Sequence, residues 1–357
     1  MTSLGILQLQ TQSDSHYINK ISQACVNRGI KVYRFTPFNY DAKERIVHGL
    51  FYNEETREWE RSSYPMPDYI YDRVFYPSDK KVRSYIQKLI HQIRKDSHFI
   101  GAGLPNKWAV YQWLKKDKYL KDHLPETNIL TNETLSTFIN KYKACLIKPL
   151  FGSSGNGIYV IEKKDDVISI KKGNGSSVQL VNNHIEEVVD YLEEHVRPYS
   201  YIIQPLLPLT INNRPFDLRI VMQKINASDW NVIGKGFRIG KERTFISNLY
   251  AGGGIQSTLQ LPKSYITPIK ENLRKILPII PLQIQKFHRP LFELGIDIGI
   301  DTFGNVWILE VNSKPGYETV LKTTHISKKD MIFEGPVKLI TNLEKHNRLL
   351  DSKKIEY

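Results

Sequence analysis

The stretch from residue 293 to residue 316, ELGIDIGIDTFGNVWILEVNSKPG, constrains the fold more than any other part of this 357-residue chain. Apolar and other residues alternate in both of its arms, as in half-buried strands, and DTFGN supplies turn chemistry between them. The pattern predicts a β-hairpin whose loop is Thr302 to Asn305. In that register Asp297 lies opposite Glu310, and Asn312 is a neighbour on the same face of the hairpin.

Two carboxylates in this position repel each other, because opposed Cβ atoms in an antiparallel pair are only about 4.5–5.5 Å apart. The hairpin therefore needs a positive charge between them. One interpretation is an ion pair with Lys314 or with an arginine from elsewhere in the chain. The other is Mg²⁺, which takes carboxylate and amide oxygens and shares its coordination shell with nucleotide phosphates. The hairpin alone leaves both interpretations open.

The composition excludes several classes of protein. Hydrophobic residues make up 41% and charged residues 24%, values typical of a globular protein. No apolar run approaches the ~20 residues that span a bilayer, and the first twelve residues lack the basic start of a secretory signal. The two cysteines, Cys25 and Cys145, cannot make a disulfide framework, so a reducing cytoplasm is the expected location.

The chain is strongly basic. Lys and Arg number 50 against 37 Asp and Glu, which gives a formal net charge of +13. This excess favours an anionic ligand, whether a nucleotide, a nucleic acid or an acidic polymer, although a solvated basic surface explains it equally well. No element interleaves basic and aromatic residues as a nucleic-acid reader motif does, which argues against a nucleic-acid partner.

The order of predicted elements indicates a mixed α/β (α+β) chain. A β–α–β pattern opens it, with Ser13 or Asp14 able to cap the first helix. Asn106 can cap a helix from Lys107 to Leu120, and Pro336 can begin a C-terminal helix. The predicted units are a small α/β domain at 1–104, two α+β subdomains at 105–204 and 205–335, and a C-terminal helix and tail at 336–357.

A glycine-rich segment, IKPLFGSSGNGI at residues 147–158, is the second strong signal. Small residues let backbone N–H groups approach anionic oxygens. A P-loop would continue into a helix, but the residues that follow read as another strand. The segment is therefore predicted to link two strands as a flap, with Lys148 placed to reach a phosphate or an adenine nitrogen. A plain hairpin turn is the alternative.

Asp217 and Arg219 are two residues apart on a predicted strand and so share a face. They could pair with each other. Alternatively, the arginine could neutralise phosphate through its fork of donors, while the aspartate accepts from ribose hydroxyls. Arg238, followed by Asn248 and a glycine cluster at 252–254, gives a weaker group of donors.

In this order and spacing, the segments resemble the ATP-grasp superfamily over residues 104–317. The resemblance implies an ATP-grasp fold, in which two α+β subdomains grip ATP after a small α/β domain. The sequences FDLR, ISNLYAGGG and EVNSKPG are most similar to the YheC/YheD group of spore-coat-associated ATP-grasp proteins. The chain departs from the ribosomal-protein glutamate ligase branch at Ile246, where that branch often has arginine, so the substrate of that branch is not carried over.

The resemblance also implies a set of site residues. Asp297, Glu310 and Asn312 would hold Mg²⁺, and Lys148, Arg219 and Arg238 would act on the phosphates during catalysis. The implied nucleotide-binding residues, which include a flap, an adenine hinge and an apolar slot, are Lys107, Lys148, Gly152, Ser153, Ser154, Gly155, Gly157, Gln204, Leu207, Asp217 and Leu309.

The activity implied is that of an ATP- and Mg²⁺-dependent carboxylate–amine ligase. ATP would phosphorylate a carboxylate on a small molecule or a peptide, and an amine or another nucleophile would attack the acyl phosphate, leaving ADP and phosphate. The resemblance further implies a cytoplasmic protein associated with the spore. A kinase acting on a hydroxyl group and a non-catalytic ATP-binding coat protein remain alternatives, and the sequence gives no prediction of oligomeric state.

Overall fold

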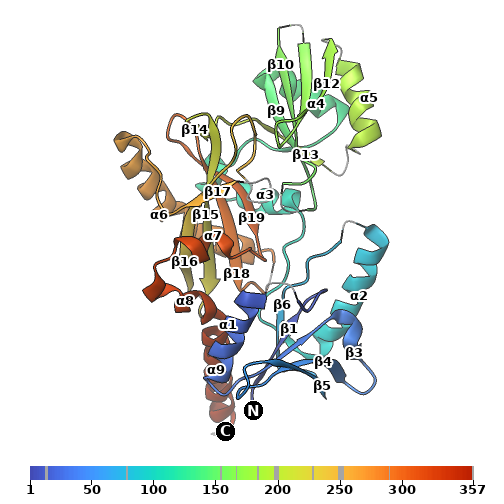
Figure 1. Ribbon diagram of the computed structural model, residues 1–357, viewed down its shortest axis with the longest axis vertical. Helices are drawn as coiled ribbons and strands as arrows, with labels where there is room; N and C mark the ends of the chain where they lie inside the picture. Colours follow the sequence, from blue (N-terminus) through green and yellow to red (C-terminus); the bar gives the residue numbers. More distant parts are fainter. Residues whose placement is uncertain are drawn as a thin grey trace.

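The computed structural model describes residues 1–12, 15–77, 79–152, 155–165, 167–182, 185–196, 201–226, 229–247, 253–288 and 290–355. Three sheets follow one another along the long axis of the molecule, each built from one continuous part of the sequence (Figure 1). Helices cover them, which confirms the predicted mixed α/β class.

The first sheet is built around parallel strands. Its strands are β1 (Ser3–Leu7), β2 (Lys31–Phe35), β3 (Tyr40–Asp41), β4 (Ile46–Tyr52), β5 (Trp59–Pro65), β6 (Tyr69–Asp72) and β7 (His98–Phe99), and its helical elements are α1 (Ser15–Val26), η1 (Pro37–Asn39) and α2 (Lys80–Asp96). β1 pairs in parallel with β2 on one side and with β6 on the other. From β1 the chain first adds β2 on one side and later adds β6 on the other side. The carboxyl ends of β1 and β6 therefore lie next to each other at the point where the strand order changes direction. The predicted caps, Ser13 and Asp14, lie outside the described residues.

The second sheet carries the glycine-rich segment. Its elements are β8 (Asn128–Ile129), α4 (Asn132–Tyr142), β9 (Ala144–Pro149), β10 (Tyr159–Lys164), β11 (Val167–Lys172), β12 (Ser177–Asn182), α5 (Ile185–His195) and β13 (Tyr201–Pro205). β9 and β10 pair antiparallel, so the segment joins two strands as predicted. The sequence did not predict the hairpin of β11 and β12.

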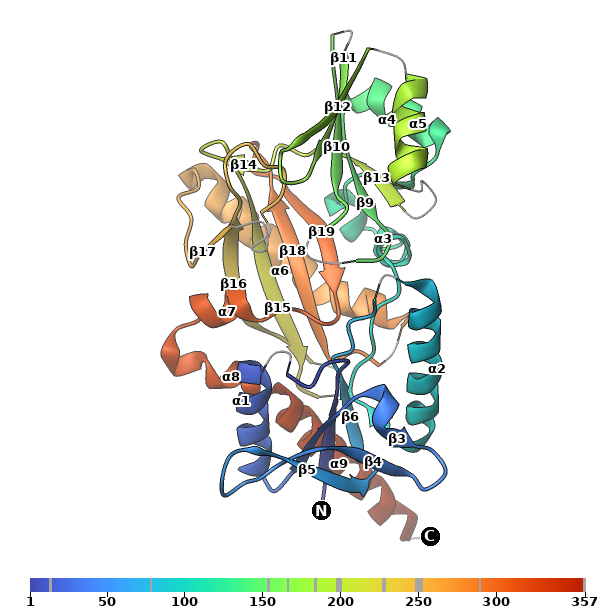
Figure 2. The same ribbon diagram turned by 45° about the vertical axis from the view of Figure 1, so that its right-hand side comes forward.

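The third sheet contains the predicted hairpin. Its elements are β14 (Thr210–Ile211), β15 (Arg214–Lys224), β16 (Trp230–Ile239), β17 (Gly254–Gln256), α6 (Lys263–Gln285), β18 (Glu293–Ile300) and β19 (Val306–Asn312). Along the sheet the strand order is β17-β16-β15-β18-β19. Alternate residues of β18, such as Ile296 and Ile298, form a core with Ile276 and Ile280 of α6. Figure 2 shows α6 lying alongside these strands.

A short helix, α3 (Lys107–Lys115), also packs on the core of the third sheet through Val110 and Leu114. The prediction that this helix extends to Leu120 was wrong. The carboxylate of Asp117 accepts hydrogen bonds from the backbone N–H groups of Tyr119 (2.9 Å) and Leu120 (3.1 Å), which competes with helical bonding and starts a separate turn, η2 (Leu120–His123).

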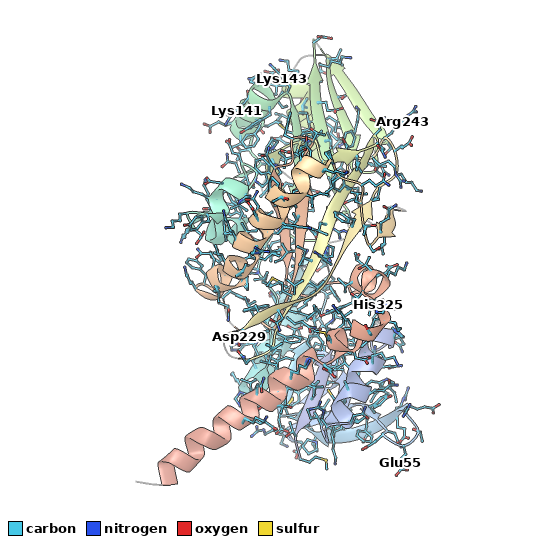
Figure 3. All side chains as sticks on the ribbon, turned by 90° about the vertical axis from the view of Figure 1, so that its left-hand side faces the viewer. Glu55, Lys141, Lys143, Asp229, Arg243 and His325 are labelled. Atoms are coloured by element: carbon cyan, nitrogen blue, oxygen red, sulfur yellow. The ribbon has the colours of Figure 1, made fainter. Side chains whose placement is uncertain are left out.

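The C-terminal elements return to the first sheet. The remaining elements are α7 (Glu318–Thr323), η5 (Ile326–Lys328), α8 (Asp330–Phe333) and α9 (Gly335–Ile355). Val337 and Ile340 of α9 join the core that contains Ile18 of α1, and Figure 3 shows α9 continuing beyond the body of the molecule. Pro336 is the second residue of this helix, not the first as predicted.

The hairpin has the predicted pairing around Asp297, but its turn differs from the prediction. Asp297 pairs with Glu310, as predicted, but β18 ends at Ile300 and the loop begins at Asp301. The predicted loop of 302–305 was one residue too short, because the Asp301 carboxylate accepts bonds from the N–H groups of Phe303 and Asn305, both at 2.9 Å. A bulge at Leu309 absorbs the extra residue and restores the register.

Among the described residues, no helix has both the length and the apolar character needed to cross a membrane.

Candidate active site

The strand register brings the predicted charged residues together on one face of the third sheet. Arg219 on β15 is the cross-strand partner of Asp297 on β18, which in turn pairs with Glu310 on β19. On the other side of β15, Asp217 pairs with Arg238 of β16. Cross-strand partners project from the same face of a sheet, so four neighbouring strands contribute to a single charged surface.

Two arginines supply the positive charge that Asp297 requires. Arg219 donates to its carboxylate from Nε and from Nη2, the latter at 3.0 Å, and Arg238 Nη2 lies 3.0 Å from Asp297 Oδ2. Burial alone would raise the pKa of Asp297, but the two guanidinium groups outweigh it and hold that pKa at about 2. Asp297 is therefore a carboxylate at neutral pH.

The alternative of Lys314 as the neutralising cation was wrong. The Lys314 ammonium donates instead to Asp72 Oδ1 at 2.7 Å and to the carbonyl of Val74 at 2.8 Å. Asp72 is the last residue of β6 in the first sheet, and Val74 lies just after it. Lys314 thus ties the segment after β19 to the N-terminal part of the chain.

Asp217 and Arg219 do not pair with each other, although they share a face. Asp217 accepts from Arg238, at 2.7 Å from Nε and 2.6 Å from Nη2, and also from the Ser247 hydroxyl. Arg238 therefore contacts Asp217 and Asp297 at once. The pairings run across strands because side chains on adjacent strands are closer to each other than residues two apart on one strand.

Two lysines approach this surface from other elements. Lys148 on β9 is only 7% exposed, and its Nζ donates to the carbonyl of Leu309 at 3.1 Å. Burial lowers the pKa of Lys148 to about 8, against the opposing attraction of Glu310. Lys107, the first residue of α3, has its Nζ 3.5 Å from Glu310 Oε1 and donates to the carbonyl of Gly152 at 2.7 Å.

A narrow cleft separates the second and third sheets beside these lysines. Its volume is about 40 Å³, and it is lined by Lys107, Val110, Tyr111, Leu114, Leu124, Pro125, Lys148, Ile202, Gln204, Ile308, Leu309, Glu310 and Val311. Apolar walls with a few polar groups are typical of small-molecule sites, but such sites usually measure about 300–1,000 Å³. A nucleotide would therefore fit only if the two sheets move apart.

The adenine-binding residues predicted from the resemblance are only partly gathered in this cleft. Gln204 and Leu309 line it, and the Gln204 side chain is fixed in the wall by donating to Thr127 Oγ1 at 2.7 Å. Leu207 is not among the lining residues, and its carbonyl accepts from the N–H group of Leu209 at 2.9 Å. The sequence analysis did not assign Val110, Tyr111 or Leu114, although an apolar stripe at helical spacing marks them as a packed face.

The glycine-rich flap has the backbone conformation that its glycines suggest. Gly155 and Gly157 have φ values of 73° and 74°, in the left-handed region that disfavours other residues. A Cβ atom at Gly157 would lie 3.0 Å from the Tyr201 hydroxyl. Ser153 and Ser154 of the flap lie outside the described residues, as do Asn248 and Gly252 of the second glycine cluster.

Asp297, Glu310 and Asn312 offer the oxygen donors that Mg²⁺ prefers, and in this structure both Asp297 oxygens accept bonds from Arg219, so Mg²⁺ would have to replace part of that ion pair. Asp297 and Glu310 are opposed across the hairpin, and Asn312 follows two residues later on the same strand face. Within the described ranges, no group of three or more His, Cys, Asp or Glu side chains could hold a metal ion. A hard cation here would therefore also need the Asn312 amide and oxygens supplied by its ligand, as Mg²⁺ commonly does with phosphates.

A buried polar cluster that was not predicted from the sequence joins the first and third sheets. Arg73 and Glu293, 1% and 2% exposed, form an ion pair at 3.1 Å. Tyr71 donates to both carboxylate oxygens of Glu293 at 2.8 Å, and Tyr317 also donates to it. Glu293 shares a strand face with Asp297, so the cluster supports the hairpin from its N-terminal end. Arg73 and Glu293 are 220 residues apart in sequence, so no local pattern predicts their pairing.

The chain is similar in sequence to known proteins. The chain is 30% identical over 352 residues to the endospore coat-associated protein YheC of Bacillus subtilis (strain 168), a match covering 95% of each chain. It is 23% identical over 223 residues to the tetrahydromethanopterin:alpha-L-glutamate ligase of Methanocaldococcus jannaschii, covering 61% of this chain and 63% of that ligase.

The fold is similar to that of D-alanyl-alanine synthetase A from Vibrio cholerae, with a TM-score of 0.54 and 13% identity over 95% of this chain and 99% of that one. ATP-grasp ligases as a class use ATP and Mg²⁺. The model of the YheC/D-like ATP-grasp family matches residues 96–341, and the chain belongs to this family.

Proposed function

We propose that this protein is an ATP- and Mg²⁺-dependent ligase that activates a carboxylate as an acyl phosphate and transfers the acyl group to an amine or another nucleophile. One observation carries the proposal. Lys107 and Lys148 reach the strand of Glu310 from two separate elements, next to the Asp297 carboxylate and its arginines. This places several cations and two carboxylates around one cleft.

The charges suit phosphoryl transfer, which depends on positioning and charge neutralisation more than on a protein nucleophile. Lys107 and Lys148, which line the cleft, would balance the negative charge of the triphosphate. Arg219 and Arg238 would stabilise the phosphoryl group in transfer. Bound Mg²⁺, held by Asp297, Glu310 and Asn312, would add charge stabilisation at the phosphate oxygens.

Two residues have different parts in this proposal. Asp217 accepts two hydrogen bonds from Arg238, so it would orient this arginine rather than serve the nucleotide alone. The flap glycines would cover the phosphates, and Gln204, Leu207 and Leu309 would surround the adenine. Opening of the cleft would precede nucleotide entry.

The acceptor is proposed to be a carboxylate on a small molecule or a peptide. The names of the relatives support this class, since one is a glutamate ligase and a protein of similar fold is a D-alanyl-alanine synthetase. We also propose a cytoplasmic protein associated with the spore, because the relative YheC is described as endospore coat-associated. Immunoblotting of spore coat and cytoplasmic fractions tests this placement.

The activity is tested by incubating the purified protein with ATP, Mg²⁺ and fractions of cell extract. Phosphorus NMR follows the nucleotide products, and mass spectrometry identifies which metabolites or peptides change in mass. We expect ADP and phosphate together with a product joined through a new amide or ester. AMP and pyrophosphate would contradict the acyl-phosphate route.

Two further outcomes separate the alternatives. ADP with a stable phosphorylated product, and no amide when amines are supplied, would identify a kinase. Mg²⁺-dependent ATP binding without turnover in any fraction would identify a non-catalytic ATP-binding protein. The Glu310→Gln variant serves as the blank in each reaction.

A further inference from the structure

An exposed surface that combines aromatic and basic side chains lies beside the candidate site. We call it the α2 surface, and define it by Lys81, Val82, Tyr85 and Lys88 of α2 together with Phe38. Its apolar members are unusually exposed: 55% for Phe38, 46% for Val82 and 56% for Tyr85. Grouped exposed apolar side chains mark binding surfaces more often than isolated ones do.

The helix is built to present this surface outward. Its buried side is formed by Ile86, Ile90 and Ile93. Lys81, Tyr85 and Lys88 follow one another at spacings of four and three residues, which places them on one exposed stripe. The Phe38 ring stacks on Tyr85, with centroids 6.2 Å apart.

The stripe is positively charged without internal compensation. In the part of the chain that the structure describes, no carboxylate forms an ion pair with Lys81 or Lys88. The helix contains one acidic residue, Asp96, at its far end. These two ammonium groups are therefore available to an anionic partner.

The N-terminal end of α2 lies close to the candidate site. The Arg83 guanidinium, on a different side of the helix from the stripe, lies 4.6 Å from the centroid of the Phe151 ring, so α2 contacts the start of the flap. The next residue, Gly152, accepts a hydrogen bond from Lys107, which is itself 3.5 Å from Glu310. Figure 1 and Figure 2 both show one end of α2 close to α3, the helix that carries Lys107.

We infer that the α2 surface docks an acidic polypeptide, so that the carboxylate activated in the site belongs to a peptide chain rather than to a free amino acid. This inference rests on the proposed ligase function. The unpaired ammonium groups complement acidic side chains, and the aromatic and aliphatic side chains offer contacts for apolar residues of the same peptide. Because the N-terminal end of α2 lies close to the flap, a peptide bound on this surface would have one end near Glu310.

The test measures binding alone, so it does not depend on turnover. Two fluorescein-labelled peptides of equal length are titrated with the full-length protein and followed by anisotropy at low ionic strength. One peptide is oligo-glutamate, and in the other two glutamates are replaced by phenylalanine. We expect both to bind, and the Lys81→Glu/Lys88→Glu variant to bind each about tenfold more weakly, because charge reversal at exposed sites acts most strongly at low salt.

The matched control is Lys263→Glu/Lys270→Glu on α6, which has the same charge change and the same seven-residue spacing on another exposed helix face. Its affinity for both peptides should stay within about twofold of wild type, since distant exposed charges are screened by solvent and salt. The Tyr85→Ala variant should weaken only the phenylalanine-containing peptide.

Three results would overturn the inference. Equal weakening by both double variants would mean that only the overall charge attracts the peptide. Unchanged binding by all variants would place the peptide elsewhere. A single-stranded DNA probe of the same charge that binds as tightly, and depends on the same two lysines, would assign the surface to nucleic acid. Because none of these measurements uses ATP, a failed ligase reaction and a failed docking surface give distinct results.

Discussion

The Lys148 ammonium donates a hydrogen bond to the backbone carbonyl of Leu309, with 3.1 Å between Nζ and O, across the cleft between the second and third sheets. Leu309 is the bulged residue of β19. A bulged residue is left out of the regular ladder, so its backbone groups are available to side chains. The extra residue in the hairpin thus creates the acceptor that holds Lys148 close to Glu310.

Nucleotide affinity should depend on the protonation of Lys148. Burial lowers the pKa of this lysine to about 8, so it is charged below that pH and increasingly neutral above it. Because the charged form attracts phosphate, the affinity for ATP should fall as the pH rises above about 8, by at most about tenfold per unit. Calorimetric titration with ATP and Mg²⁺ across this range measures the slope. The Lys148→Met variant should bind weakly with no such slope, and a flat profile in the wild type would contradict the assignment.

Glu310→Gln should abolish turnover and leave the fold intact. Glu310 is 24% exposed, and its ion pair with Lys107 spans 3.5 Å, so losing its charge should change the free energy of unfolding by less than about 1 kcal/mol. The same change removes a carboxylate from the proposed Mg²⁺ site. ATP consumption and the melting temperature are measured together. A folded variant with wild-type ATP consumption would show that Glu310 has no part in the reaction.

Asp297→Asn should instead destabilise the protein. The side chains of Arg219 and Arg238 are only 11% and 12% exposed, and Arg219 would lose its anionic partner, whereas Arg238 would keep Asp217. Leaving a buried charge without a partner typically costs about 3–5 kcal/mol, which urea unfolding detects readily. Equal unfolding free energies for this variant and for Glu310→Gln would be inconsistent with the buried network.

The same carboxylate gives a pH dependence with a defined sign. The pKa of Asp297 is about 2 in the folded protein, below its ordinary value of 3.8. Its contribution to stability is therefore fully present above about pH 4 and is lost as the pH falls towards 2. In acid unfolding, the Asp297→Asn variant should therefore not show the loss of stability that the wild type shows between about pH 4 and pH 2.

Local sequence patterns predicted the centre of the site because strand alternation is a local property. The pairing of Asp297 with Glu310 followed from it, and so did the antiparallel strands around the flap. The turn was misjudged because Asp301 bonds to its own loop, an effect that composition does not reveal. The cross-strand partners of Arg219 and Arg238 depended on the register between strands far apart in sequence.

Helix α6 was missed for a different reason. It contains three prolines, Pro268, Pro278 and Pro281, and each interior proline costs a helix about 3 kcal/mol. Burial of an apolar face that includes Ile276 and Ile280 compensates for this loss in the folded protein. Such tertiary compensation has no signature in a sequence window that contains repeated helix breakers.

The close packing of Gly295 against Pro315 should control the position of Asn312. Gly295 is the cross-strand partner of Asn312, and a Cβ atom at this position would lie 2.7 Å from Pro315 Cβ. Gly295→Ala should therefore push the segment after β19 away from β18. Overpacking of this kind typically costs about 1–3 kcal/mol. We expect a lower melting temperature and a loss of the Mg²⁺-dependent part of ATP binding.

A second glycine on the same sheet separates displacement of Asn312 from general damage to the fold. Gly254 on β17 has no atom within 4 Å of a Cβ added to it. Gly254→Ala should therefore keep the wild-type melting temperature. Its affinity for ATP should also fall as much as that of the wild type when EDTA removes Mg²⁺, which we call the EDTA effect. If Gly295→Ala loses stability but keeps the EDTA effect, then Asn312 does not contribute to the metal site. If both alanine variants lose the EDTA effect, then the response does not depend on the contact between Gly295 and Pro315. Loss of the EDTA effect in Gly295→Ala alone is the expected result, because only that substitution presses on Pro315, three residues after the Asn312 amide.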